Sequence, residues 1–238
     1  QTFQPDHAAD YPAPFRDKDG HWYGFAARAR ILLVNTDLVR EDQRPRGIEE
    51  LTDPRWKGRV GLAKPLFGTT ATHAACLFAS WGELRAKRYF QALKANGAAI
   101  FSGNKQVAQA VSAGQIAVGL TDTDDAMIEI AQGRPAAIVY PDRERDQLGT
   151  LFLPNTLAIP KFAAHFDEAV KLAGHLLSAS VENALANGPS AQIPLGKQAK
   201  APARVETPAT VHPMTVDFEA AAGGFETSAR FFAELFGR

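Results

Sequence analysis

Short apolar runs alternate with amphipathic stretches between residues 59 and 140, and this alternation restricts the fold more than any other feature. Each run expected to be a strand is followed by small polar residues and then by a helical pattern. The expected strands are residues 59–63, 100–101, 116–120 and 136–140, and the expected helices are residues 72–81, 84–93, 107–111 and 126–131. Strands and helices in this alternation predict a mostly parallel α/β sheet.

The rest of the chain supplies further elements. Residues 22–35 contain the continuous apolar run Ile31-Leu32-Leu33-Val34, which is typical of a strand covered on both faces. The preceding residues read as an extended lead-in that ends in a turn at Lys18-Asp19-Gly20. One more strand is expected at 151–159, and helices are expected at 166–178, 180–187 and 225–236. A chain of 238 residues is long enough for two lobes.

The charge balance gives no sign of a nucleic-acid or membrane partner. The chain has 26 Lys and Arg against 26 Asp and Glu, so its formal net charge is zero. No apolar run reaches the roughly 18 residues needed to cross a bilayer. The single cysteine, Cys76, excludes an internal disulfide and a cysteine-based zinc site. Because the chain starts with Gln1, we expect that a preceding segment such as a signal peptide has been removed.

Small polar groups follow three of the expected strands. They are Gly68-Thr69-Thr70, Ser102-Gly103-Asn104 and the stretch 121–125, which begins with Thr121 and reads Thr-Asp-Thr-Asp-Asp. In an open parallel sheet, ligands bind beyond the carboxyl ends of the strands, where loops and helix N-termini meet. The first two groups suit an anion or a polar solute, because the first N–H groups of a helix carry partial positive charge. Simple helix capping explains these two groups equally well.

The acidic cluster of Asp122, Asp124 and Asp125 is harder to explain by capping. An Asp in the first turn of a helix gains about 0.3–1 kcal/mol from the helix dipole. Two carboxylates about 5 Å apart repel by about 3 kcal/mol at an effective dielectric constant of about 20, so a desolvated cluster needs counter-charge. Two interpretations follow: the cluster stays hydrated, or it receives a cation.

Arg28 and Arg30 alternate along the expected strand at residues 22–35, so they point to the same face. Two guanidinium groups on one face need an anion or a carboxylate, which Asp122 and its neighbours could supply. An ion-pair network without any ligand is therefore an alternative to a binding site. No two of the six histidines have helix-face spacing, so a histidine-rich zinc site is not expected. We expect His73, which follows the first polar group, to be structural.

Several segments resemble the family of periplasmic ferric-iron-binding proteins, the solute-binding components of ABC importers. The resemblance is carried by DKDGHWYGFAARARILLVNTDLV at 17–39, LTDPRWKGRVGLAKP at 51–65, FGTT at 67–70, LKANGAAIFSGNKQVAQAVSAGQIAVGLTD at 93–122 and GPSAQIPL at 188–195. Each motif is short, but their common order and spacing from residue 15 to residue 195 make the resemblance specific.

The resemblance implies an α/β fold of the type II periplasmic-binding-protein kind, with two lobes joined by crossing strands and a solute held in the cleft between them. It implies a periplasmic or extracellular location and delivery of the solute to an ABC permease. In this family, residues matching the threonine turn, Asn104 and Asp122 help to hold an anion beside the metal, and an arginine of the crossing strand joins them. The expected ligand-binding residues are Gly68, Thr69, Thr70, Asn104, Thr121, Asp122, Arg28 and Arg30.

One departure from the family pattern concerns the metal ligands. The family usually has a Tyr-Tyr pair at the positions of Asp124 and Asp125, and the phenolates of that pair are its main ligands for ferric iron. Carboxylate oxygens also suit hard cations, so Asp124 and Asp125 are the expected metal ligands of this chain. The solute is then an iron-like metal ion with a companion anion, another small polar solute or an organic cation.

A second departure is that the family pattern has a further part before the point matching Pro14, which we expect to be missing from this chain. We therefore expect one complete α/β lobe and part of a second. The expected division is a lead-in and hinge strand at 1–34, an α/β carboxyl-terminal lobe at 35–147, the remainder of the amino-terminal lobe at 148–205 and closing helices at 206–238. The incomplete lobe is expected to be covered by a second copy in a homo-oligomer or by a separate amino-terminal fragment.

The preferred functional hypothesis is a non-catalytic solute-binding component of an ABC importer. A strand followed by Asp-Thr-Asp-Asp also fits a magnesium-dependent phosphohydrolase, in which Asp122 attacks phosphorus and Asp124 acts as acid or base. That enzyme would need a lysine and further acidic residues at later strand ends. Only Tyr140-Pro141-Asp142 offers such an acid, so the binding protein is the preferred hypothesis.

Overall fold

The computed structural model describes residues 1–237, which form two compact units. Unit 1 contains Gln1–Arg28 and Phe152–Thr207, and unit 2 contains Ala29–Leu151 and the chain from Pro208 onward. The chain therefore passes from one unit to the other three times. The division expected from the sequence placed these boundaries after residues 34, 147 and 205. Among residues 1–237, no helix combines the length and the apolar character that a bilayer crossing requires.

The main sheet is mixed. Its strands lie in the order β3-β2-β4-β1-β5, with bounds β1 Trp22–Asn35, β2 Val60–Ala63, β3 Ala99–Phe101, β4 Val118–Asp122 and β5 Ala136–Val139. β2 runs parallel to β3 and β4, whereas β1 runs antiparallel to β4 and β5. The four strands expected between residues 59 and 140 therefore all run in one direction, and β1, which lies between β4 and β5, runs against them, so the pairing is mixed rather than mostly parallel. The apolar run in β1 reads alike in both directions and carries no information on strand direction.

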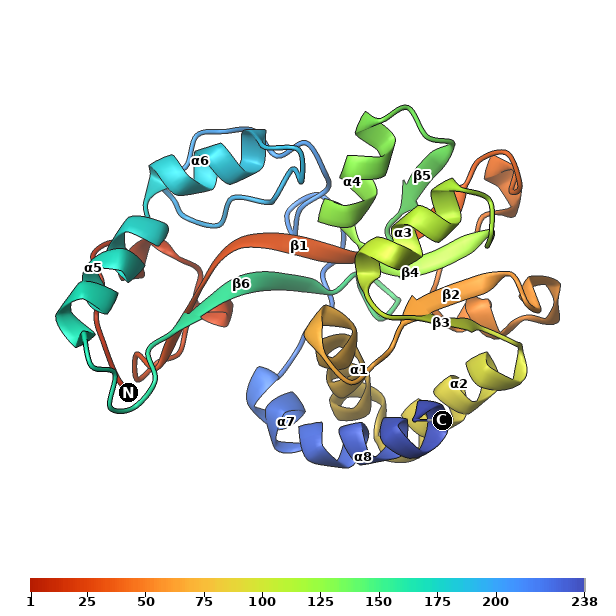
Figure 1. Cartoon of the computed structure of the whole chain (residues 1–238), viewed down its shortest axis with the longest axis horizontal. Coiled ribbons are helices and arrows are strands. Elements are labelled where there is room, and N and C mark those ends of the chain that lie inside the picture. The colour runs from red at the N-terminus through yellow and green to blue at the C-terminus, as the bar shows by residue number, and fades with distance from the viewer. Residues whose placement is uncertain (238) are drawn as a thin grey trace. The chain divides into compact units, whose positions relative to one another are not determined.

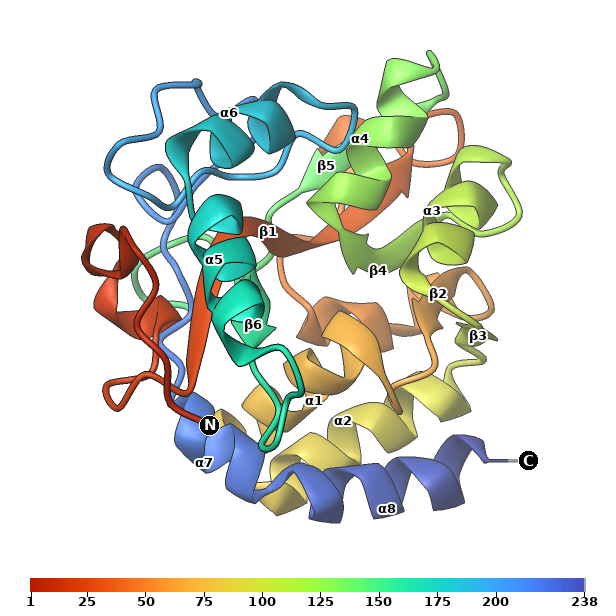
Figure 2. The same cartoon turned by 60° about the vertical axis from the view of Figure 1, so that its left-hand side comes forward.

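Helices cover both faces of the sheet in unit 2 (Figure 1, Figure 2). α1 (Gly68–Trp81) and α2 (Glu83–Ala95) lie on one face, and α3 (Asn104–Ser112) and α4 (Thr123–Ala131) lie on the other. Gly119 of β4 lets α3 approach closely, because a Cβ there would lie 2.5 Å from Val107 and 2.8 Å from Val111. The short helix α7 (Phe218–Gly223) and the closing helix α8 (Phe225–Phe236) pack against α1.

Three helices of unit 2 begin earlier than expected. α1 begins at Gly68, α3 at Asn104 and α4 at Thr123, three or four residues before the apolar pattern starts. Gly68-Thr69-Thr70 therefore forms part of the first turn of α1, whereas in the other two groups only Asn104 and residues 123–125 are helical. Ser, Thr, Asn and Asp favour both conformations, so the sequence alone does not separate them. Gly68 has a φ of +64°, a conformation that favours glycine, at the start of α1.

Unit 1 is built around the first half of β1, which pairs with β6 (Phe152–Ala158). α5 (Phe166–Leu176) and α6 (Ala179–Asn187) complete it, and all three elements were expected from the sequence. The buried carboxylate of Glu182 on α6 accepts hydrogen bonds from the backbone N–H groups of Ala26, Leu195 and Gly196, at 2.7, 2.8 and 2.6 Å. The remaining helical segments of both units are short 3₁₀ turns at Ala8–Asp10, Ala13–Phe15, Glu41–Gln43, Glu49–Thr52 and Pro54–Trp56.

An aromatic cluster attaches α8 to unit 2. The side chain of Phe232 is 0% exposed, and its ring centroid lies 4.6 Å from that of Phe90 and 5.8 Å from that of Phe78. Both contacts are edge-to-face, the arrangement that aromatic rings prefer. The expectation that aromatic residues at helical spacing form a docking helix at 225–236 is confirmed.

Replacing Phe232 with alanine should lower the free energy of unfolding by about 3–5 kcal/mol, because it leaves a cavity among aromatic rings. Phe225 begins the same helix but is 40% exposed, so its alanine variant is the matched control and should change stability by about 0.5 kcal/mol or less. Urea unfolding of both variants measures the difference. Equal losses for Phe232→Ala and Phe225→Ala would contradict this account of the docking.

Candidate functional site

A buried ion pair connects β1 and β4. Arg30 and Asp122 are direct neighbours in the antiparallel register of these strands. Nη1 of Arg30 donates a hydrogen bond to Oδ1 of Asp122 at 2.7 Å. Arg30 is 0% exposed and Asp122 is 3% exposed. A guanidinium group can be buried this deeply only if an opposite charge and hydrogen-bond acceptors compensate for the lost water.

Three neutral side chains complete what we call the polar cluster, which consists of Arg30, Thr69, Thr70, Asn104 and Asp122. The Thr69 hydroxyl donates to Oδ2 of Asp122 at 2.5 Å, and Nδ2 of Asn104 donates to the same oxygen at 2.8 Å. Nδ2 of Asn104 also donates to Oγ1 of Thr69 at 2.7 Å, and the Thr70 hydroxyl donates to Oδ1 of Asn104 at 2.9 Å. The guanidinium of Arg30 donates longer bonds of 3.2–3.3 Å to the three neutral side chains.

The sheet topology brings these residues together. β2, β3 and β4 run parallel to one another, so their carboxyl ends lie at the same edge of the sheet. α1 follows β2, α3 follows β3 and α4 follows β4, so the first turns of these helices meet at that edge. β1 runs in the opposite direction and places Arg30 against the end of β4. The expected meeting of the threonine turn, the asparagine, the arginine and the acidic cluster is therefore present in unit 2.

Asp124 and Asp125 extend the polar cluster into a set of three carboxylates. Both lie in the first turn of α4, where the helix dipole favours negative charge, and Asp122 is the residue that precedes the helix. Asp122, Asp124 and Asp125 each offer a carboxylate oxygen, and the three atoms lie within 4.8 Å of one another. A carboxylate has about four lone-pair positions, of which Asp122 uses three within the polar cluster. The three residues therefore fit a hard cation, which prefers oxygen ligands.

The remaining expected ligand residues have other surroundings. The Thr121 side chain is fully buried and donates to the backbone carbonyl of Asn104 at 3.0 Å, so it positions Asn104. Arg28 belongs to unit 1, where its guanidinium donates a hydrogen bond to Oδ1 of Asn155. A role for Arg28 in ligand binding stays a prediction. His73 is buried in α1, one turn after the threonines.

Two further residues of this region were not among the expected ligand-binding residues. Thr123 accepts a hydrogen bond from the backbone N–H of Ala29 at 3.1 Å, which ties the start of α4 to β1. Phe67 directly precedes α1 and is 62% exposed, beside the threonine turn. The signal for Phe67 was a large apolar residue next to Gly-Thr-Thr, in a position where a polar cap is usual.

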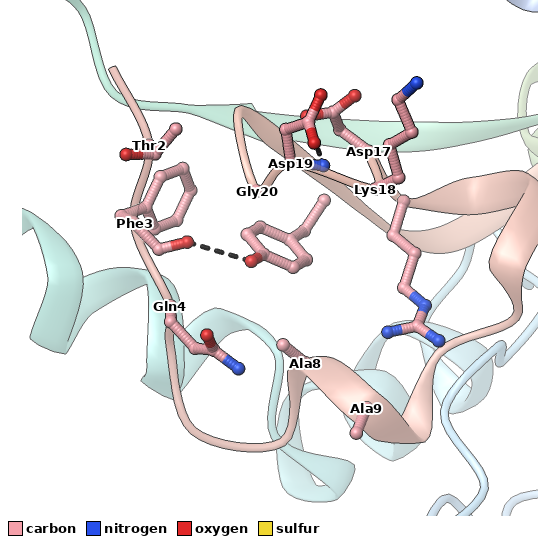
Figure 3. A pocket seen from close by; sticks show the side chains of 11 residues that line it. Thr2, Phe3, Gln4, Ala8, Ala9, Asp17, Lys18, Asp19 and Gly20 are labelled. Carbon is pink, nitrogen blue, oxygen red and sulfur yellow. Dashed lines mark hydrogen bonds between the residues drawn. The ribbon is translucent and has the colours of Figure 1, made fainter.

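A second group of metal-ligand types lies in unit 1, beside a cavity of about 410 Å³ (Figure 3). Figure 3 shows Asp17, Lys18, Asp19 and Gly20 at one end of this cavity, with residues 2–4 along another wall. Oδ2 of Asp17 accepts hydrogen bonds from the backbone N–H groups of Asp19 and His21 and from Nδ1 of His21. These bonds, with the backbone bond from His21 contributing most, lower the pKa of Asp17. The group thus closes the turn that the sequence predicts at residues 18–20.

The comparisons with known proteins agree with this fold. Residues 1–220 match the family model described as bacterial extracellular solute-binding protein. Iron uptake protein A1 of Synechocystis sp. is 28% identical over 77% of this chain and 54% of that protein. The chain thus spans about half the length of this curated relative.

Solved structures share the fold. Iron-bound HitA from Pseudomonas aeruginosa has a TM-score of 0.85 at 23% identity, over 98% of this chain and 76% of that chain. AfuA from Actinobacillus pleuropneumoniae, with exogenous fructose-6-phosphate bound, has a TM-score of 0.86 at 22% identity, over 98% of this chain and 75% of that chain. The likeness confirms the expected periplasmic-binding-protein fold of type II. With 220 of its 238 residues matched, this chain belongs to the bacterial extracellular solute-binding protein family.

Proposed function

We propose that this chain is a solute-binding component of an ABC importer, that it works in the periplasm or outside the cell, and that it delivers a hard metal ion to a membrane permease. The family membership supports solute binding, and the names of the Synechocystis and Pseudomonas relatives support iron. The three carboxylates of Asp122, Asp124 and Asp125 carry the proposal, because they gather oxygen ligands at one point.

The charges at the site favour a cation over an anion. Arg30 and Asp122 cancel each other within the polar cluster, and Asp124 and Asp125 add negative charge at the start of α4. A positively charged solute reduces the repulsion among these carboxylates. Both a metal ion and an organic cation carry the required positive charge. The close grouping of carboxylate oxygens favours the metal ion.

The phosphohydrolase alternative is not supported. The family match is to solute-binding proteins. In addition, the proposed nucleophile Asp122 is buried, and both of its carboxylate oxygens accept hydrogen bonds from the polar cluster. A nucleophile must reach the phosphorus atom of its substrate, which this arrangement prevents.

Three of the four tyrosines of this chain are poorly suited to bind the metal as phenolates. The hydroxyls of Tyr11, Tyr23 and Tyr89 donate to backbone carbonyls at 2.8, 2.8 and 3.1 Å. Burial raises the pKa of all three phenols, so their ionisation is unfavourable. We therefore assign the metal contacts to carboxylates, including Asp124 and Asp125.

A neutral histidine lies beside the polar cluster. Nδ1 of His73 is buried and has no hydrogen-bond partner among residues 1–237. Burial, and to a smaller extent the positive charge of Arg30, hold the pKa of His73 well below its usual value. A protonated His73 would place a second positive charge next to the guanidinium. Stability of this region should therefore fall in acid.

Replacing both Asp124 and Asp125 with asparagine should abolish the stabilisation of the protein by its metal ion. For the wild type this stabilisation follows RT ln(1 + [L]/Kd), which is about 2.7 kcal/mol when the free ion is at 100 times Kd. Thermal unfolding with Mn²⁺ or with ferric iron as its nitrilotriacetate complex measures the effect. The double variant Asp167→Asn/Glu168→Gln is the matched control, because it removes two acids from the first turn of α5.

An unchanged metal response in the Asp124/Asp125 variant would place the metal site elsewhere in the chain. A wild type that responds to quaternary ammonium ions but to neither metal would assign an organic cation to the same carboxylates. Loss of the response in the α5 control as well would point to a general charge effect rather than to ligation.

The ferric complex of the wild type should show no visible phenolate-to-iron charge-transfer band, since its ligands are carboxylates. The variant Asp124→Tyr/Asp125→Tyr should gain this band and should bind ferric iron more tightly. Visible absorption spectra during an iron titration measure both effects. A coloured wild-type complex would show that a tyrosine of this chain binds the metal after all.

Acid should destabilise the wild type through His73. The folded pKa of this residue lies below its ordinary value of 6.5, so the unfolded state binds more protons once the pH falls below that value. The contribution of this residue to the free energy of unfolding is intact above that pH. As the pH falls further, the contribution decreases by up to about 1.4 kcal/mol per pH unit. Urea unfolding across this range should show a shallower decline for His73→Leu. His175→Gln on the exposed side of α5 is the control and should decline as the wild type does.

A further inference from the structure

The threonine and asparagine donors expected to hold a companion anion are already used inside the polar cluster. Nε of Arg30 is also buried, but it has no hydrogen-bond partner among residues 1–237. A threonine hydroxyl has one hydrogen to donate, and an asparagine amide has two. The Thr69 hydroxyl donates to Asp122, and the Thr70 hydroxyl donates to Asn104. Both amide hydrogens of Asn104 are also used, one on Thr69 and one on Asp122. An added anion could accept hydrogen bonds from these donors only after their present bonds to Asp122, Asn104 and Thr69 had been broken.

The Asp122 carboxylate receives the bonds that such an anion would receive. Its Oδ1 accepts from the guanidinium of Arg30 on β1, and its Oδ2 accepts from Thr69 on α1 and Asn104 on α3. Donors from three separate elements thus converge on one planar, singly charged group. This is the geometry by which proteins hold carboxylate and related oxyanions.

Charge also disfavours a second anion at this position. Asp122 already neutralises the charge of Arg30, and both side chains are buried. An added phosphate or bicarbonate would lie next to the fixed carboxylate, where little water is present to reduce their repulsion. The first N–H groups of α1 and the Nε–H of Arg30, which has no partner among residues 1–237, would be the attractions left for it.

We propose that Asp122 is the counter-anion of this site, supplied by the chain itself, so that the protein takes up a bare cation rather than a cation paired with a free anion. The part that concerns the cation rests on the proposed function. The part that concerns the anion does not, because it predicts how the polar cluster responds to anions when no metal is present.

The first experiment contains no metal. Thermal unfolding of wild type and of Asp122→Asn is followed during titration with inorganic phosphate, with chloride at equal ionic strength as the reference. The wild type should show no phosphate-specific stabilisation. Asp122→Asn should gain affinity for phosphate by at least tenfold, because it leaves the guanidinium of Arg30 without its counter-charge. Asp167→Asn removes the same charge from the first turn of α5 and leaves the ion pair intact, and it should behave as the wild type does.

The second experiment measures the affinity of the wild type for Mn²⁺ by calorimetric titration, with and without bicarbonate. The two affinities should agree within twofold. The inference is overturned if phosphate alone stabilises the wild type, if bicarbonate raises the Mn²⁺ affinity tenfold, or if folded Asp122→Asn ignores phosphate. Should Asp122→Asn fail to fold, the two wild-type measurements still decide. A wild type that binds no Mn²⁺ counts against the proposed function alone.

Discussion

The structure of the polar cluster in unit 2 depends on the burial of the Arg30 guanidinium. A positive charge inside a sheet is tolerated only when an opposite charge lies at hydrogen-bond distance, and Asp122 is that charge. Removing either partner would leave the other buried and unpaired, which typically costs about 3–5 kcal/mol. The helices that begin at Gly68 and Asn104 are therefore arranged around a pair that the sheet itself holds in register.

The direction of β1 matters because of this pair. Three parallel strands deliver helix N-termini to one edge of the sheet, which on its own gives a site that attracts anions. The antiparallel β1 adds a guanidinium, and the end of β4 adds a carboxylate directly opposite it. The two charges cancel, so the character of the site is decided by the next residues of α4, Asp124 and Asp125. An edge of the sheet suited to anions thus carries additional carboxylates, and the proposed cation site rests on this arrangement.

Apolar spacing in the sequence was enough to predict most strands and helices. The continuous run Ile31–Val34 fits a strand buried on both faces, and the aromatic residues of α8 recur at the spacing of one helix face. It was not enough for the helix starts, where Thr69, Asn104 and Asp124 suit a turn as well as a first helical turn. It also missed α7, whose Ala-Ala-Ala-Gly core has no apolar period. The site residues could be predicted because they follow the ends of expected strands. Their hydrogen bonds could not be predicted, because these bonds depend on the register between β1 and β4, which a single sequence does not reveal.

The three acidic residues Asp122, Asp124 and Asp125 lie within a stretch of four residues that spans the end of β4 and the start of α4. Under the proposed function, Asp122 supports the fold through its ion pair with Arg30, and Asp124 and Asp125 contact the cation from the start of α4. Exchanges at positions 124 and 125 would then change the preferred solute without disturbing the ion pair. A receptor built in this way can change its cargo through neighbouring codons while its scaffold stays fixed.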